Sequence, residues 1–217
     1  MIPVKDNIPT ERKPLVTLAL IAANVVVFLV AGSGAHELVS YGAVPYALTH
    51  SGARWGTVFS SMFLHASVVQ LAGNMLFLWI FGNTIEDSMG HAKFLGFYVL
   101  GGLATLALQV AAEPNSVAPI VGAEGAVAAV LGGYIVLYPR GQALTLVLIP
   151  FFFTVIEVPA PIMLALWFAM QVVFAAVGLT DPVGSTSPGA YFANLAGFAV
   201  GALTVRLLAT HRVPVPA

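Results

Sequence analysis

The sequence FLGFYVLGGLATLALQVAA, residues 94–112, contains no charged side chain. A helix crosses the hydrocarbon core of a bilayer with about 20 mostly apolar residues, and this stretch has that length. Other largely uncharged stretches lie on both sides of it, at residues 15–34, 55–85, 119–138, 161–179 and 189–205. We therefore predict an all-α bundle of six membrane-spanning helices. The core of the second helix is expected at residues 71–81, because 55–85 is longer than one span.

The composition favours the same fold class. Of the 217 residues, 59% are hydrophobic and 8% are charged, whereas about 25% of the residues in a soluble domain are charged. So few charges cannot cover a water-facing surface, which excludes a soluble globular domain and a disordered chain. The formal net charge of -1 leaves no basic field for phosphates, which excludes a nucleic-acid partner. Because the chain has no cysteine, thiol catalysis and zinc–thiolate sites are also excluded, and we predict neither metal nor cofactor.

One apolar segment, residues 142–158, does not fit the pattern of six spans. It contains a β-branched and aromatic run at 150–156, and Pro159 and Pro161 follow it closely. We interpret it as an interfacial or partly membrane-inserted linker rather than a seventh span.

The basic residues predict the orientation of the bundle. If six helices alternate, seven Lys and Arg residues fall on one side and only Arg54 falls on the other. The seven are Lys5, Arg12, Lys13, Lys93, Arg140, Arg206 and Arg212. We predict a multi-pass protein of the plasma membrane. The positive-inside rule then places both of its termini in the cytoplasm. Residues 1–14 form the N-terminal segment, 15–209 the membrane domain and 210–217 a short tail.

Two of the predicted helices carry unusually small residues, and polar side chains occur beside them. The fourth contains residues 122–133, rich in Gly and Ala, and the sixth contains a G-x-x-x-G pattern at Gly197 and Gly201. Small residues allow helix backbones to approach closely in lipid, so these two helices should pack together. Polar groups at this depth need partners. We therefore predict a polar cluster donated by helices two, four and six: Gln70, Asn74, Glu124 and Asn194.

The motifs around these residues resemble those of the rhomboid family of intramembrane serine proteases, in particular its bacterial members. Residues 61–65, 73–83, 85–87 and 90–91 are similar to the family's second-helix signature. Residues 121–126, which include Gly122 and Gly125, lie where the family has G-x-S-G, and residues 194–201 lie where it has A-H-x-G-G-x-x-x-G. The resemblance implies six helices around a water-filled cavity that opens to the outside. It also implies a long first loop that lies partly in the membrane.

Three departures from the family pattern fall on its chemistry. The family's nucleophilic serine corresponds to Glu124 and its histidine base to Asn194. The first residue of its H-x-x-x-N oxyanion pair corresponds to Gln70, while Asn74 retains the second. A serine hydrolase needs a hydroxyl beside a base, and an asparagine cannot take a proton near neutral pH. The sequence therefore predicts that no catalytic residue of the dyad is intact.

Three further residues match the family or lie in its characteristic loop, and we assign them supporting roles. His65 matches a structural histidine, and Glu86 matches a position that ties loop and helix ends together. Arg54 lies in the first loop beside Trp55, in the reverse of the family's usual order, and should pair or snorkel at the outer interface.

The leading hypothesis is a catalytically inactive rhomboid that binds single-pass transmembrane segments through a lateral gate. One alternative is an intramembrane endopeptidase that acts by a modified or non-serine mechanism centred on Glu124. Aspartyl-type hydrolysis uses two coupled carboxyl groups, and we expect no second acid near Glu124. The other alternative is a proton or cation pathway through Glu124. The client and the oligomeric state are left open.

Overall fold

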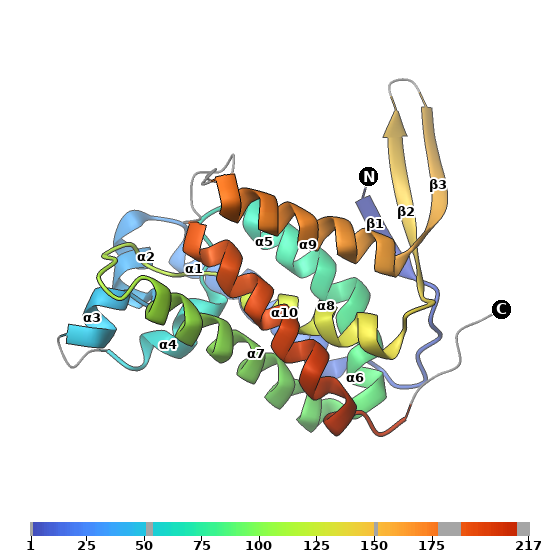
Figure 1. Ribbon diagram of the computed structural model, residues 1–217, viewed down its shortest axis with the longest axis horizontal. Coiled ribbons are helices and arrows are strands. Elements are labelled where there is room, and N and C mark those ends of the chain that lie inside the picture. Colours follow the sequence, from blue (N-terminus) through green and yellow to red (C-terminus); the bar gives the residue numbers. More distant parts are fainter. Residues whose placement is uncertain (1, 51–53, 150–151, 178–187, 212–217) are drawn as a thin grey trace.

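The computed structural model describes residues 2–50, 54–149, 152–177 and 188–211, and it is mostly helical (Figure 1). The helices are α1 (Leu15–Ala31), α2 (Ala35–Tyr41), α3 (Pro45–His50), α4 (Thr57–Ser60), α5 (Val68–Phe77), α6 (Asn83–Met89), α7 (His91–Ala112), α8 (Glu124–Leu137), α9 (Ala160–Val177) and α10 (Pro188–Leu208). A 3-10 turn, η1 (Ser61–Phe63), precedes α5, and a π-helical turn, η2 (Leu78–Gly82), joins α5 to α6. The strands are β1 (Ile2–Asp6), β2 (Gln142–Ile149) and β3 (Phe152–Pro159).

Each predicted span coincides with an apolar helix in the described part of the chain. Two of these helices are long and apolar enough to cross a membrane: Val68–Met89, which runs from α5 through α6, and His91–Ala112. Four shorter apolar helices lie at the other predicted spans: Leu15–Ala31, Glu124–Leu137, Ala160–Ala169 and Ala193–Leu208. Where the resemblance implies a long first loop, the chain forms α2, α3, α4 and η1.

The region predicted as a linker rather than a span connects α8 to α9 as two strands, so the described fold is mostly helical and not all-α as expected. Residues 142–149 and 152–159 form the antiparallel strands β2 and β3, and the N-terminal segment adds β1 to the other edge of β2. β-Branched and aromatic side chains favour strands, and Pro159 interrupts any continuous helix into α9. The sequence contains the apolar run, but it does not indicate that residues 2–6 would pair with it, because the two segments are more than 130 residues apart.

The predicted packing of the two small-residue helices is confirmed. A Cβ at Gly201 of α10 would overlap the backbone of Ala129 in α8, and a Cβ at Gly132 of α8 would overlap the backbone of Phe198 in α10. Figure 1 shows α10 crossing in front of α8. A helix that is apolar on every face belongs in the interior, and α8 is buried from Gly125 through Tyr134. This central helix presents its first residue, Glu124, to the candidate site.

Candidate functional site

A small polar cavity lies above the N-terminal end of α8. Its volume is about 70 Å³, and its walls come from η1, α5, α7, α8, α10 and the segment that precedes α8. Its polar side chains are Ser61, Gln70, Thr105, Gln109, Glu113, Ser116, Glu124 and Asn194. A cavity of this size holds a few waters at most, so the structure as described leaves no room for a peptide segment beside Glu124.

Two amide side chains hold the carboxyl group of Glu124. The Gln70 Nε2 atom donates to Oε1 at 2.9 Å, and the Asn194 Nδ2 atom donates to Oε2 at 3.4 Å. Helices α5, α8 and α10 each provide one of these side chains. Glu124 is also the first residue of α8, where the partial positive charge of a helix N-terminus attracts anionic groups. The structure thus brings Gln70, Glu124 and Asn194 together.

Gly122 lets the segment before α8 approach Gln70 closely. Its φ of +122° lies in a region that side chains rarely adopt, and a Cβ there would lie 2.8 Å from the Gln70 Nε2 atom. Its backbone N–H donates to the Ser61 carbonyl at 2.9 Å. The same Gln70 amide reaches the Val121 carbonyl at 3.4 Å. The glycine therefore fixes the wall of the cavity against η1 and α5.

Gly125 and Gly197 serve close packing behind the cavity. A Cβ at Gly125 would overlap the Thr105 side chain of α7, and one at Gly197 would overlap the Thr105 hydroxyl and approach the Gly125 carbonyl to 2.7 Å. Three helices, α7, α8 and α10, therefore meet at these two positions.

Asn74 lies apart from the other members of the predicted cluster. Its Nδ2 atom lies 3.2 Å from the His65 Nε2 atom, and it is not among the described residues that line the cavity. His65 is fully buried. The spacing of four residues places Gln70 and Asn74 on one side of α5, one turn apart along its axis. At that separation Gln70 contacts Glu124, whereas Asn74 contacts His65.

A second carboxyl group lines the cavity, contrary to the expectation from the sequence. Glu113 follows the last turn of α7, and Gln109 lies one turn before it; both are cavity-lining residues. Sequence reasoning missed Glu113 because it lies in the connection between two spans. Only the path of residues 113–123, which returns to α8 beside the cavity, reveals its place. The i, i+4 spacing of Gln109 and Glu113 is the signal that could have found it.

The cavity lacks the groups of a serine-protease dyad. Hydroxyl groups of Ser61, Thr105 and Ser116 line it, but none of its described lining residues is a histidine. Because His65 is engaged with Asn74 outside the cavity wall, these hydroxyl groups have no imidazole base beside them.

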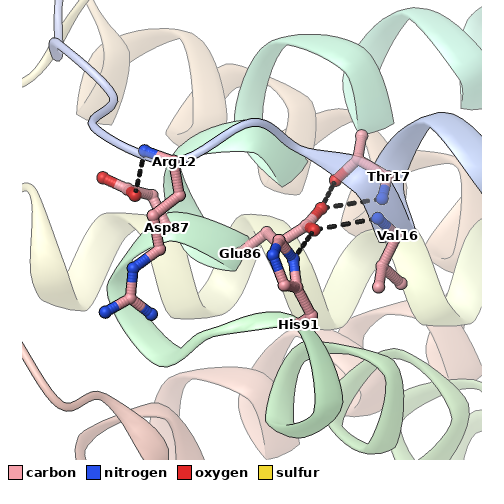
Figure 2. A network of polar contacts seen from close by, with 6 residues as sticks. All are labelled: Arg12, Val16, Thr17, Glu86, Asp87 and His91. Carbon is pink, nitrogen blue, oxygen red and sulfur yellow. Dashed lines mark hydrogen bonds and ion pairs between the residues drawn. The ribbon is translucent and has the colours of Figure 1, made fainter.

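Glu86 and Asp87 lie at the opposite end of the bundle and hold the entry to α1 (Figure 2). Glu86 accepts hydrogen bonds from the Val16 N–H at 2.8 Å, the Thr17 N–H at 2.7 Å and the Thr17 hydroxyl at 2.6 Å, and it contacts His91 Nδ1 at 2.6 Å. Asp87 accepts from the N–H groups of Glu11 and Arg12. The first N–H groups of a helix lack partners within it, so Glu86 caps α1.

Two further charged residues mark the two ends of the bundle. Asp6, at the end of β1, accepts a hydrogen bond from the Thr84 hydroxyl at 2.6 Å, and burial raises its pKa to about 6. Arg54 is exposed, and its Nη1 atom donates to the Ser40 carbonyl at 3.2 Å. Asp6 therefore belongs to the end that holds Glu86, and Arg54 to the loop between α1 and α5.

Comparison with known proteins places this arrangement in a family. The profile of the Rhomboid domain matches residues 52–211. Rhomboid protease GluP from Bacillus subtilis is 30% identical over 125 residues, which cover 55% of this chain and 24% of that protein. Rhomboid protein 1, mitochondrial, from Saccharomyces cerevisiae is 33% identical over 95 residues, which cover 42% of this chain and 28% of that protein.

A human relative, Presenilin-associated rhomboid-like protein, mitochondrial, is 29% identical over 94 residues, which cover 42% of this chain and 24% of that protein. The matched region thus spans about a quarter of the length of these relatives. The Rhomboid domain nevertheless covers most of the present sequence, including every side chain of the cavity. This chain is a membrane protein of the rhomboid family.

Proposed function

We propose that this protein is a rhomboid pseudoprotease, which binds transmembrane segments of other proteins without cutting them. The carrying observation is the group of three side chains at the head of α8: Glu124 held by the amides of Gln70 and Asn194. On the motif alignment Glu124 lies at the family's serine position, Asn194 at its histidine position and Gln70 at its first oxyanion position. This group offers no hydroxyl nucleophile, and the position of the family's imidazole base holds an amide, which cannot take a proton near neutral pH.

The proposed frame consists of six spanning helices. Their bounds correspond to α1, α5 with α6, α7, α8, α9 and α10, and the four shorter ones cross by means of their flanking residues. We place the entry for a client beside α9. Its Trp167 and Phe168 rings contact Phe198 of α10 at centroid distances of 6.2 and 5.3 Å, and outward side chains such as Leu166 are exposed. Ring contacts of this kind can separate without breaking hydrogen bonds.

The experiment restores the dyad residues. Glu124→Ser, Asn194→His and Gln70→His are made singly and together, and each purified protein is assayed with a model transmembrane substrate and a fluorophosphonate probe. The native protein should neither cleave the substrate nor label. Combined restoration should give cleavage, and Glu124→Ala with Asn194→His serves as the control that has a base but no nucleophile. Probe labelling of the native protein, abolished by alanine at one serine, contradicts the proposal.

A second candidate is supported by Glu113. Two carboxyl groups, Glu113 and Glu124, line one cavity, and paired carboxyl groups can activate water for peptide hydrolysis. On this alternative the native protein cleaves peptide bonds, and Glu113→Gln and Glu124→Gln each abolish turnover. The absence of turnover from pH 4 to 8 in the native protein removes the alternative.

The third hypothesis is a proton or cation pathway, in which Glu113 and Glu124 would bind the ion. Proteoliposomes of the native protein and of the two glutamine variants decide it: an ion flux that is lost in Glu124→Gln supports the pathway, and equal fluxes exclude it.

A further inference from the structure

The hairpin of β2 and β3 leaves the bundle where α8 ends and α9 begins (Figure 1). Its base is held on one side by β1, whose residues pair with 143–146 of β2. Ala143 and Thr145 are buried there. Beyond this base, the hairpin projects away from the helices, so its outer part needs some other surroundings.

The composition of the hairpin is unusual for a structure in water. Of residues 142–159, only Glu157 carries a charge. Val155 is 56% exposed and Ile156 is 39% exposed. Adjacent residues of a strand point to opposite faces, so β3 presents apolar side chains on both faces. A hairpin with one face in water alternates apolar and polar residues, and this one does not.

The lipid-exposed surface of the bundle continues directly into the hairpin. Helix α9 begins at Ala160, one residue after β3 ends, and its Ile162 and Leu166 are 55% and 65% exposed. Because the chain is a membrane protein, these exposed apolar side chains of a spanning helix face acyl chains. The hairpin starts at the end of that same surface.

Charges at the base of the hairpin fit the same surroundings. Arg140 lies two residues before β2, Lys5 on β1 pairs with Leu144, and both cations are exposed. The exposed Glu157 pairs with Leu144 from the other side, so the base of the hairpin is polar and carries charges of both signs. A charged base next to an apolar body is the pattern of an interfacial membrane element, and the basic residues at such a position attract anionic headgroups.

We infer that the strands β2 and β3, residues 142–149 and 152–159, are a membrane-contacting element, which lies in the headgroup–acyl boundary beside α9. Its body contacts acyl chains, and Arg140 and Lys5 contact anionic headgroups. A second copy of this chain, paired through the outer edge of β3, is the other conceivable occupant. Edge pairing would cover only the backbone groups of that edge and would leave Val155 and Ile156 in water, so lipid is favoured.

The absence of native cysteines makes a direct test possible. Single spin labels are placed at Val155→Cys and Ile156→Cys in the full chain and reconstituted in vesicles that contain anionic lipid. Leu100→Cys, on the exposed apolar face of α7, is the lipid reference, and Glu11→Cys, in the exposed N-terminal segment, is the water reference. Power saturation compares collisions with dissolved oxygen, which partitions into lipid, and with a water-soluble nickel chelate.

Labels at both hairpin positions should show an oxygen-to-nickel accessibility ratio near that of Leu100→Cys and several-fold above that of Glu11→Cys. Replacing Lys5 and Arg140 by Gln together should lower the ratio more in anionic vesicles than in neutral ones. A ratio equal to the water reference at both positions overturns the inference, and so does dipolar coupling between Val155→Cys labels on two copies. None of these results depends on whether the protein cleaves peptides, so the proposed function stands or fails separately.

Discussion

Glu86 and Glu124 show how the surroundings of one side chain decide what it does. Glu86 is 1% exposed, and its carboxylate receives two backbone N–H groups and one hydroxyl from the first turn of α1. Glu124 receives the side-chain amides of Gln70 and Asn194, and it lines a cavity. Buried carboxylates need such donors. The donors of Glu86 belong to the folded backbone, so Glu86 stabilises the fold, whereas those of Glu124 can be changed one at a time.

Replacing Glu86 with Gln should destabilise the protein strongly. A glutamine has one acceptor oxygen, and its amide group would face backbone N–H groups that also donate; one unsatisfied buried donor costs about 1–3 kcal/mol. We expect a loss of this size, measured as a lower unfolding midpoint in detergent. Glu11→Gln is the matched control, since Glu11 is exposed and only its backbone N–H contacts Asp87. Equal midpoints for the two variants would refute the capping role of Glu86.

Asp6 gives a pH-dependent prediction at the same scale. Its pKa is raised from 3.8 to about 6 in the folded protein by burial, so the folded state binds its proton more tightly than the unfolded state. The contribution of this group to the free energy of unfolding is fully present below pH 4 and is lost as the pH rises to 6. Above pH 6 the free energy of unfolding no longer changes with the titration of this group. At 1.36 kcal/mol per pKa unit, the difference is about 3 kcal/mol.

The variant Asp6→Asn keeps an acceptor for Thr84 and cannot titrate. It should match the native protein in stability at pH 4 and exceed it at pH 7, as measured by unfolding midpoints across this range. Parallel stability curves for the two proteins would show that Asp6 does not carry the effect.

Helices α8 and α10 are the elements on which the cavity depends, because their close packing places Glu124 beside Asn194. Gly201 and Gly132 allow backbone to meet backbone at two levels of this contact. Small-residue contacts of this kind replace the hydrophobic effect as the source of helix association in lipid. Any side chain at these positions would push the helices apart and would move Asn194 away from Glu124.

Gly201→Ala should therefore destabilise the bundle by about 1–3 kcal/mol, the usual cost of overpacking. A Cβ at Gly201 would meet the backbone of Ala129, which cannot rotate away. Gly96→Ala in α7 is the control, since a Cβ there meets nothing within 4 Å. Thermal unfolding in detergent measures both variants. Unchanged stability of Gly201→Ala would mean that the two helices can shift without loss.

The elements also show what the sequence could predict. Length and hydropathy were sufficient for the positions of the apolar helices, and glycine spacing predicted the contact of α8 with α10. The contact of Gln70 with Glu124 follows from the predicted polar cluster, because an acid inside an apolar bundle needs polar partners. The sheet was not, because the pairing of residues 2–6 with 143–146 depends on where the chain returns. Glu113 was missed for the same reason: its place in the cavity depends on the path of a connection.

On the scale of the whole molecule, basic residues of the described chain lie at the end that holds Glu86, and Arg54 lies away from them. Lys93 donates to the carbonyl of Leu208 at the end of α10, and the N–H of Arg12 is bound by Asp87. Arg54 belongs to the loop between α1 and α5. A bundle with its cations segregated in this way has a preferred orientation in the membrane, which we propose has both termini in the cytoplasm and the cavity nearer the outer surface.

Single cysteines test this orientation. A membrane-impermeant maleimide added to intact cells should label Arg54→Cys and should leave Glu11→Cys unlabelled until the membrane is permeabilised, since both positions are exposed in the fold. Labelling of Glu11→Cys in intact cells would reverse the proposed topology.

The capping of α1 by Glu86 has a consequence for biosynthesis. The acceptor lies 69 residues beyond Thr17 along the chain. At about 5–20 residues per second, a ribosome reaches it roughly 3–14 s after the first turn of α1 is made. During that interval the first turn of α1 lacks the side chain that caps it in the folded protein. The nascent protein must therefore tolerate an uncapped α1 until α6 has been made and brings Glu86 to it.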